Sequence, residues 1–227
     1  DITAGPLAKV WGFHRRQGRL PSADEIAAAL QLVGSQYLHL HAETKRVHFL
    51  KSGVELNLGA IGKGYALDRA RDALITGGLN DFLIHGGNSS VLARGERNAE
   101  FRTQNAESDQ SEIRNPKSAI DPGWSVALRH PLRPDVRLAE FVLCNQALGT
   151  SGSGTQFFHH QGRRYGHIID PRTGWPADQV LSATVIAPNA EQADALSTAF
   201  YVMGLEPARE FCAAHPDISA LLTTHTS

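Results

Sequence analysis

Cysteine is scarce in this sequence, and its scarcity excludes two ways of stabilising a fold. Cys144 and Cys212 are the only cysteines among the 227 residues. A single possible pair makes no disulfide framework, and neither thiol has a second cysteine nearby for a zinc site. We interpret both as small core residues. They leave the redox compartment undecided.

The sequence also lacks an excess of either charge and any long apolar run. Lys and Arg number 22 against 23 Asp and Glu, a formal net charge of -1. A nucleic-acid-binding surface needs an excess of basic residues, so we expect no nucleic acid partner. No apolar stretch approaches the ~20 residues of a membrane-spanning helix. No charged segment followed by an apolar one opens the chain, so we expect any signal peptide to lie outside it.

What is present is the composition of an ordinary globular protein, with 41% hydrophobic and 20% charged residues. The length fits one large domain or two small ones and suffices for a buried core. The first seven residues resemble the middle of a domain, and there is no initiator Met. We therefore interpret residues 1–227 as a single domain that is truncated at its N-terminus.

Local patterns predict three main helices. A capping box, Ser22 with Glu25, starts a predicted helix over 22–33. An amphipathic pattern after a run of glycines predicts a second helix over 64–76. A capping residue and helical spacing predict a final long helix over 189–204.

Alternating and apolar segments predict strands. We expect a hairpin over 37–54 with its tip at 43–45, a strand pair at 157–158 and 164–165, and further strands over 82–84, 91–93, 124–128, 140–143 and 181–187. Residues 96–122 are polar with almost no apolar spacing, so we interpret them as a long mobile insertion. Because strands and helices do not alternate regularly, the sequence predicts an α+β fold with mixed or antiparallel sheets packed with helices.

Residues 167–176 form the most informative segment, a rigid polar turn that follows an apolar pair. Proline and glycine fix its backbone, while His167, Asp170, Arg172 and Thr173 supply a base, an acid, a cation and a hydroxyl. Rigid loops with such groups often carry catalysis. His167 is suited to act as an acid or base near neutral pH, although a histidine that ends a strand is more often structural. A surface turn with incidental polar side chains stays an alternative.

Within the predicted helix 189–204, Asp194 and Thr198 are four residues apart and share one face. A carboxylate and a hydroxyl are hard oxygen ligands of the type that Mg²⁺ prefers, completed by carbonyls, water or phosphates. The spacing alone favours the alternative, in which Asp194 complements the helix dipole and Thr198 has no special role.

Segment 56–64 is a strand-like stretch that enters a glycine-rich helix start. Small residues let a ligand approach the backbone, free amides at a helix start bind anions, and Lys63 adds a positive charge. The order of its glycines and lysine is not that of a P-loop, so a phosphate site here is one reading among others. Segment 150–154 is either a second small-residue cradle or a flexible link between strands.

Taken together, these segments resemble the ApbE family of FAD:protein FMN transferases. The resemblance covers nearly the whole chain and rests on six segments in the family's order. They are residues 1–13, 57–68, 86–87, 150–152, 167–176 and 193–199.

The resemblance implies a Mg²⁺-dependent enzyme that splits the pyrophosphate of FAD, passes FMN to a Thr or Ser hydroxyl of an acceptor protein and releases AMP. By the family's pattern, the backbone carbonyl of Ala60 holds the cation together with Asp194 and Thr198. His167 is the catalytic group implied to help deprotonate the incoming hydroxyl. The implied flavin nucleotide site comprises Asp1, Asn57, Lys63, His167 and Ile168.

Three departures from the family's pattern leave alternatives open. The family usually carries a further segment ahead of the position of Asp1, Asn57 stands where it typically carries Asp, and residues 96–122 exceed the usual connection. The alternatives are an FAD-binding but catalytically impaired member, or an FAD pyrophosphatase that gives FMN and AMP.

The resemblance also implies partners and a location. The partners are FAD, as substrate, and an acceptor protein of a flavin-dependent redox complex. The implied location is extracytoplasmic, on the periplasmic side of the inner membrane. Membrane contact is then expected only through an N-terminal lipid anchor that would lie outside this chain.

Overall fold

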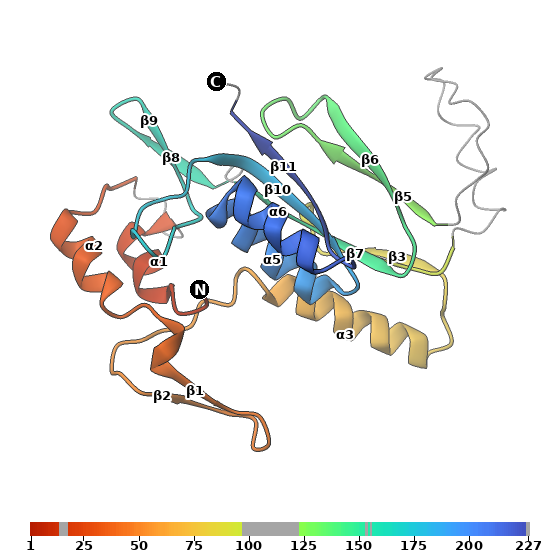
Figure 1. The fold of residues 1–227 in the computed structure, drawn as a ribbon, viewed down its shortest axis with the longest axis horizontal. Coiled ribbons are helices and arrows are strands. Elements are labelled where there is room, and N and C mark those ends of the chain that lie inside the picture. Colours follow the sequence, from red (N-terminus) through yellow and green to blue (C-terminus); the bar gives the residue numbers. More distant parts are fainter. Residues whose placement is uncertain (14–17, 97–122, 153, 155, 226–227) are drawn as a thin grey trace.

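A five-stranded antiparallel sheet lies at the centre of the structure, with its strands in the order β11-β10-β7-β4-β3 (Figure 1). The computed structural model describes residues 1–13, 18–96, 123–152, 154 and 156–225. The bounds of the sheet strands are Phe82–His85 (β3), Ser90–Arg94 (β4), Gln146–Gly152 (β7), Val180–Ala187 (β10) and Ser219–Thr224 (β11). Apart from Glu96, the predicted insertion over 96–122 lies outside the described residues.

Alternation along the central strands buries both faces of this sheet. In β4 and β7, Leu92 and Ala147 belong to the core on the helical face, while Val91 and Leu148 belong to a second core on the opposite face. Helix α5 (Ala190–Met203) contacts β4, β7 and β10 on the helical face. The helices α3 (Gly62–Thr76) and α6 (Leu205–Ala214) flank it. The opposite face packs against the antiparallel pair β5 (Trp124–Arg129) and β6 (Arg137–Leu143).

A close backbone approach brings α5 onto the sheet. A Cβ atom added to Gly149 of β7 would lie only 2.4 Å from the carbonyl oxygen of Ala193. Only glycine leaves room for that contact. The face of α5 that carries Ala193 and Asp194 is therefore held against β7 and the neighbouring β4.

A separate apolar cluster joins the N-terminal helices to the segment before the polar turn. It consists of Leu7, Trp11, Ile26, Ala29 and Tyr165. These residues come from α1 (Gly5–Trp11), α2 (Ala23–Leu30) and β9 (Arg163–Gly166), which pairs with β8 (Phe157–His160). The Trp11 indole Nε1 donates a hydrogen bond of 2.8 Å to the carbonyl of Gly174. The N-terminal helices are thereby tied to the 167–176 turn.

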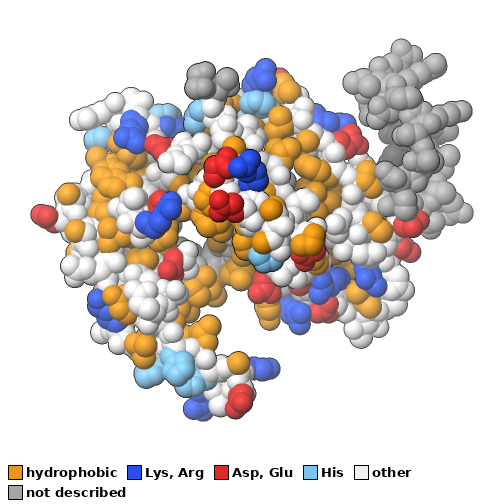
Figure 2. All heavy atoms as spheres, in the orientation of Figure 1, with side chains coloured by type: hydrophobic (Ala, Val, Ile, Leu, Met, Phe, Trp, Pro, Cys, Tyr) orange, Lys and Arg blue, Asp and Glu red, His pale blue; other side chains and the backbone are white. Residues whose placement is uncertain are grey.

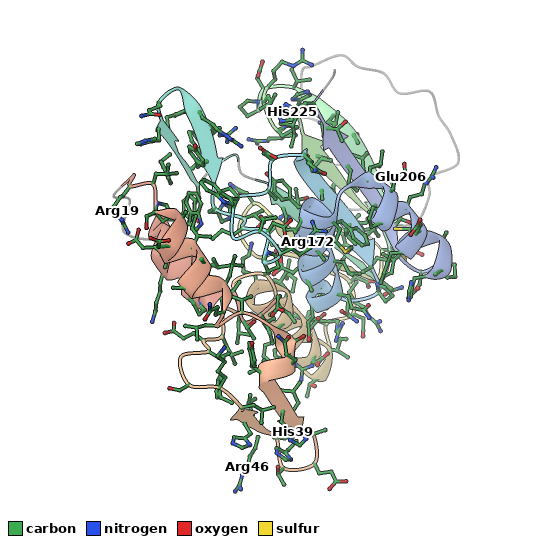
Figure 3. The ribbon with its side chains drawn as sticks, turned by 60° about the vertical axis from the view of Figure 1, so that its left-hand side comes forward. Arg19, His39, Arg46, Arg172, Glu206 and His225 are labelled. Atoms are coloured by element: carbon green, nitrogen blue, oxygen red, sulfur yellow. The ribbon has the colours of Figure 1, made fainter. Side chains whose placement is uncertain are left out.

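The hairpin of β1 (Leu38–His41) and β2 (Arg46–Phe49) follows a short 3-10 helix, Ser35–Tyr37, and projects from the body (Figures 1 and 3). Its register places His39 opposite His48 on one face and Leu40 opposite Val47 on the other. Histidine side chains gather at this hairpin in Figure 2. This hairpin lies away from helix α5 and from the 167–176 turn (Figure 1).

The predicted elements are largely confirmed, with five corrections. The hairpin ends at Phe49 rather than Val54. Residues 56–58, predicted as a strand-like stretch, belong to no helix or strand. Helix α2 has the complete capping box but ends at Leu30 rather than Val33. Helix α5 has its predicted cap but is not the last helix, because α6 begins directly after Gly204. Residues 150–152 are part of β7 rather than a flexible link. The α+β class with antiparallel sheets is as predicted. Among the described residues, no helix has both the length and the apolar character needed to cross a membrane.

Candidate functional site

The Asp194 carboxylate joins three elements that are far apart in sequence. It is only 4% exposed. Its Oδ2 accepts a hydrogen bond of 3.0 Å from the backbone N–H of Gly64 in α3, and its Oδ1 accepts one of 2.8 Å from the Ser90 hydroxyl in β4. A buried carboxylate needs such partners, because desolvation of an unpaired charge is costly. Asp194 therefore lies where α5, the start of α3 and β4 meet.

Gly64 makes this meeting possible. A Cβ atom added to Gly64 would lie 2.1 Å from the carbonyl oxygen of Ala190, a distance that no side chain tolerates. The first turn of α3 thus touches the first turn of α5 directly. The amide of Gly64 is among the first four of a helix, which have no partner within the helix, and it donates to Asp194 instead.

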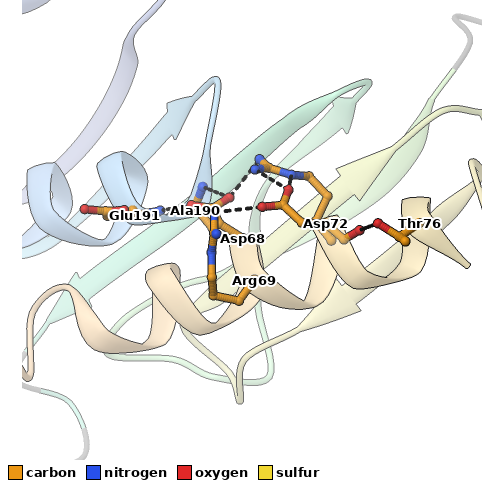
Figure 4. Close-up of polar contacts among 7 residues, drawn as sticks. Asp68, Arg69, Asp72, Thr76, Ala190 and Glu191 are labelled. Atoms are coloured by element: carbon orange, nitrogen blue, oxygen red, sulfur yellow. Dashed lines mark hydrogen bonds and ion pairs between the residues drawn. The ribbon is translucent and has the colours of Figure 1, made fainter.

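Asp68, which no sequence pattern marked as functional, holds the same two helices together (Figure 4). Its buried carboxylate accepts hydrogen bonds of 3.1 and 2.9 Å from the backbone N–H groups of Ala190 and Glu191, and it pairs with Arg71 at 2.9 Å. It thus caps α5 from the neighbouring helix. No local signal set Asp68 apart, because its neighbours on the helix include the charged residues Arg71 and Asp72.

The loop before α3 presents the carbonyl of Ala60. The Asn57 side chain accepts a hydrogen bond of 2.9 Å from the Gly59 amide, and the amides of Ile61 and Gly62 donate to the carbonyl of Leu58. Within the described part of the chain, no donor is recorded for the Ala60 carbonyl oxygen. Ala60 lies four residues before Gly64, whose amide donates to Asp194.

Thr198 lies one turn after Asp194 and bonds to β7. Its Oγ1 lies 2.8 Å from the Oγ of Ser151, which lies 2.9 Å from the Oγ of Ser197. The described residues include no group of three or more His, Cys, Asp or Glu suited to hold a metal. A cation here would therefore depend on one carboxylate, a hydroxyl and a carbonyl. Such oxygen sets suit Mg²⁺, which usually keeps several waters and binds substrate phosphates as well.

Lys63 and His167 lie close enough to influence each other. The ammonium of Lys63 donates to the Ser89 hydroxyl. His167 is partly buried, and its Nδ1 lies 3.2 Å from the carbonyl oxygen of Gln156. Burial lowers the pKa of His167, the Gln156 carbonyl opposes that effect, and the positive charge of Lys63 lowers the pKa further. The imidazole is therefore neutral at neutral pH and able to accept a proton.

The other polar groups of the 167–176 turn are occupied within the turn. Asp170 receives three side-chain bonds of 2.7–3.1 Å from Arg172, and the Thr173 hydroxyl accepts from the Trp175 amide. Burial alone would raise the pKa of Asp170, but its hydrogen bonds and ion pair with Arg172 offset this and hold the pKa below its usual value. Of the four groups in the turn, only His167 has its described contact entirely outside the turn, with the Gln156 carbonyl.

Two further predicted residues have mainly local contacts. The Asp1 carboxylate accepts bonds from the amide and hydroxyl of Thr3, at 2.9 and 2.7 Å, and from the amide of Ser35 at 3.2 Å. Asp1 still lies beside the loop, because the next residue, Ile2, accepts from the Asn57 amide. Ile168 is buried in the main core, so its backbone rather than its side chain is what a ligand could meet.

A cavity of about 520 Å³ opens beside the turn, between β9, the start of β10 and the end of α5. Arg163, Tyr165, Trp175, Tyr201 and His225 are among its lining residues. Its lining includes none of the predicted catalytic, flavin or metal residues. The candidate site is therefore defined by the contacts around Asp194 rather than by this cavity.

Comparison with known proteins identifies the family. The model of the ApbE family matches residues 1–222. The chain belongs to the ApbE family. The six segments that predicted this membership lie within the matched range.

Individual ApbE relatives are similar along the whole chain. An FAD:protein FMN transferase of Klebsiella pneumoniae (strain 342) is 32% identical over 229 residues, 99% of this chain and 63% of the relative. An enzyme of the same name from Treponema pallidum (strain Nichols) is 31% identical, covering 96% of this chain and 58% of its own length. This chain therefore spans about three fifths of these curated relatives.

Solved ApbE structures share the fold. The ApbE protein of Thermotoga maritima has a TM-score of 0.78 at 33% identity, over 98% of this chain and 66% of that one. The flavin transferase ApbE of Vibrio cholerae has a TM-score of 0.79 at 26% identity, over 100% of this chain and 65% of its own. The helix-covered antiparallel sheet is thus the ApbE fold.

Proposed function

We propose that this protein transfers FMN from FAD to a Thr or Ser hydroxyl of an acceptor protein, with release of AMP and dependence on Mg²⁺. Membership of the ApbE family and the names of the relatives support flavin transfer. The observation that carries the proposal is the contact of Asp194 with Gly64, which joins the Lys63 loop to the Asp194–Thr198 face of α5.

The residues around this contact fit a divalent cation and a phosphate-bearing substrate. The Ala60 carbonyl, the Asp194 carboxylate and the Thr198 hydroxyl would hold Mg²⁺, since all three supply hard oxygen atoms. When bound, the cation supplies charge neutralisation for the pyrophosphate of FAD. Lys63 at the start of α3 adds a positive charge from the protein itself, and phosphoryl transfer depends mainly on such neutralisation and on positioning.

His167 then has a defined part in the reaction. The acceptor hydroxyl oxygen forms a bond to the phosphorus of the FMN half, and the bond from that phosphorus to the bridging oxygen breaks. AMP leaves with the bridging oxygen. The proton of the hydroxyl passes to the imidazole of His167, which is neutral and therefore able to accept it.

Asn57 bears on the two alternative functions, an FAD pyrophosphatase and an FAD-binding protein with impaired catalysis. Its Oδ1 accepts from the Gly59 amide, a bond that an aspartate oxygen can equally accept, so the loop keeps its shape without a carboxylate. The remaining difference between Asn and Asp at this position is a negative charge. Because the effect of that charge on catalysis is measurable, one experiment distinguishes the transferase from a hydrolase that uses water as acceptor and from an impaired FAD-binding protein.

The test combines FAD, Mg²⁺ and a candidate acceptor that bears a threonine. We expect the acceptor to gain the mass of FMN and AMP to appear in equal amount, measured by intact mass spectrometry and chromatography. AMP release from FAD without acceptor would support the hydrolase. Tight FAD binding without AMP release, by both the parent protein and its Asn57→Asp variant, would support the binding protein.

The acceptor and the location belong to the same proposal. We place the acceptor in a flavin-dependent redox complex on the periplasmic side of the inner membrane, with this protein on the same side. This placement is what the resemblance to the ApbE family implies. Fractionation of cells that express the full-length protein tests it, and recovery from the cytoplasmic fraction alone would contradict it.

A further inference from the structure

Two serines bond directly to the predicted cation ligands of the α5 face. The Ser90 hydroxyl lies 2.8 Å from Oδ1 of Asp194, and the Ser151 hydroxyl lies 2.8 Å from Oγ1 of Thr198. Ser90 is 1% exposed and Ser151 is partly buried. They come from the neighbouring strands β4 and β7, from the positions that point to α5. Each predicted side-chain ligand thus has its own serine partner.

The donors and acceptors around Thr198 can be assigned from the hydrogen count. The Ser197 hydroxyl donates to the carbonyl oxygen of Asp194 at 2.9 Å, which uses its only hydrogen. Ser151 must therefore donate to Ser197, and Thr198 must in turn donate to Ser151. The weaker 3.5 Å contact of Thr198 with the Asp194 carbonyl is also a donation by Thr198. In either case the hydrogen of Thr198 is engaged and its lone pairs are free.

The bond of Ser90 has a comparable effect on Asp194. An ionised carboxylate only accepts hydrogen bonds, so the Ser90 hydroxyl donates to Oδ1 while the Gly64 amide donates to Oδ2. The two donors sit on different oxygens and fix the plane of the carboxylate. Each oxygen keeps a further lone pair for a ligand.

We propose that Ser90 and Ser151 are positioning residues that prepare the Asp194 carboxylate and the Thr198 hydroxyl to bind a divalent cation. The inference rests on the proposed function, because it assumes that these two groups are cation ligands. The serines act through the ligands. Ser90 orients the Asp194 carboxylate, and Ser151 accepts the hydrogen of the Thr198 hydroxyl, which leaves the lone pairs of that oxygen for a cation. Partners of this kind typically affect metal affinity by 10–100-fold.

The experiment measures cation binding directly, without the reaction. Mn²⁺ prefers the same carboxylate, carbonyl and water ligands as Mg²⁺, and its free concentration is measured by electron paramagnetic resonance. The complete protein is titrated with MnCl₂, and the bound ion is then displaced with MgCl₂. We expect Ser151→Ala and Ser90→Ala each to raise the Kd about tenfold or more. Ser151→Thr keeps the hydroxyl, so its Kd should stay close to that of the parent protein.

Ser182→Ala is the matched control. Ser182 is another buried serine of the same sheet, and its hydroxyl donates to the Thr223 hydroxyl at 3.2 Å rather than to a predicted ligand. Its Kd for Mn²⁺ should be unchanged. Circular dichroism in EDTA checks the fold of each variant. If one of the two alanine variants does not fold, the other carries the test.

The outcomes separate this inference from the proposed function. If the parent protein binds no Mn²⁺ that Mg²⁺ displaces, the proposed cation site itself is wrong. If it does bind, but folded Ser90→Ala and Ser151→Ala bind as tightly as Ser182→Ala, the positioning role is overturned and the cation site stands. A loss in Ser151→Thr as large as that in Ser151→Ala also counts against the role of the hydroxyl.

Discussion

At the scale of single residues, three of the four polar side chains in the 167–176 turn form hydrogen bonds within the turn. Asp170 and Arg172 neutralise each other, and Thr173 caps the end of the turn. His167 is left, partly buried and close to Lys63, with its pKa lowered first by desolvation and further by that positive charge. A neutral imidazole beside a cation is suited to accept a proton from a hydroxyl.

The pH dependence of the reaction should follow His167. Because its pKa lies below 6.5 in the folded protein, the initial rate of AMP release should rise with pH through an apparent pKa below that value and then level off. Removing the base with His167→Gln should lower the rate by roughly 10²–10⁴-fold and abolish this rise. Initial rates across the acid-to-neutral range measure both effects. A midpoint above 6.5, or an unchanged profile in the variant, would contradict this role.

The lowered pKa of His167 also makes the free energy of unfolding depend on pH. The unfolded chain takes up a proton at His167 near pH 6.5, whereas the folded protein does so only at lower pH. The contribution of His167 to stability is therefore complete above 6.5 and is lost as the pH falls through the folded pKa. Urea unfolding at several pH values, with His167→Gln as control, measures this contribution.

At the scale of elements, the site depends on how closely α3 and α5 approach. Gly64 permits the contact, and Asp68 secures it by accepting from the first amides of α5. Figure 4 shows Asp68 between the two helices. Because Asp194 and Thr198 follow within the next three turns of α5, their position relative to the Ala60 loop is set by this junction.

We expect Asp68→Asn to destabilise the fold by about 1–3 kcal/mol, because one amide of α5 and the Arg71 guanidinium lose a buried charged partner. Asp72→Asn is the matched control. It removes an acid from the same helix that also pairs with Arg71, but Asp72 is 44% exposed, and exposed pairs contribute little. Chemical unfolding of both variants gives the comparison. An equal loss of stability in the Asp68→Asn and Asp72→Asn variants would show that the capping contact is unimportant.

At the scale of the whole molecule, two separate cores meet at the 167–176 turn. The N-terminal helices form one with β9, and the sheet with α5 forms the other. The Trp11 indole donates to Gly174 across 163 residues of sequence, and Arg172 in the same turn donates to the Val202 carbonyl at the end of α5. The turn that carries His167 is thus held from both sides.

Replacing Trp11 with Phe should weaken the attachment of the turn, because it removes one buried hydrogen bond and part of a ring packed in the N-terminal cluster. The Gly174 carbonyl would lose its donor, so we expect a loss of about 1–3 kcal/mol in the free energy of unfolding. Trp175→Phe is the control, because Trp175 is 39% exposed and loses no contact of that kind among the described residues. Thermal and chemical unfolding measure the stability of both variants. A stable Trp11→Phe variant would show that the turn is held by other contacts.

Features that depend on neighbouring residues could be predicted from the sequence alone. The capping box at Ser22, the Asn189 cap, the hairpin over 37–54 and the shared face of Asp194 and Thr198 all follow from spacing within a few residues. Recognition of the family also came from linear segments. Helices α1 and α6 and strands β7 and β11 were missed. Helix α6 follows Gly204 without a linker, and β7 is rich in small polar residues.

The tertiary structure alone brings the groups of the site together. Gly64, Ser90 and Asp68 reach their partners on α5 across 130, 104 and 122 residues, and no local pattern specifies such contacts. It also decided the direction of the hydroxyl hydrogen bonds around Thr198, because each hydrogen is assigned only when all its neighbours are known. The physical reason is that packing, not spacing, brings α5 against Gly64 and Gly149, where a single added carbon atom would keep it away.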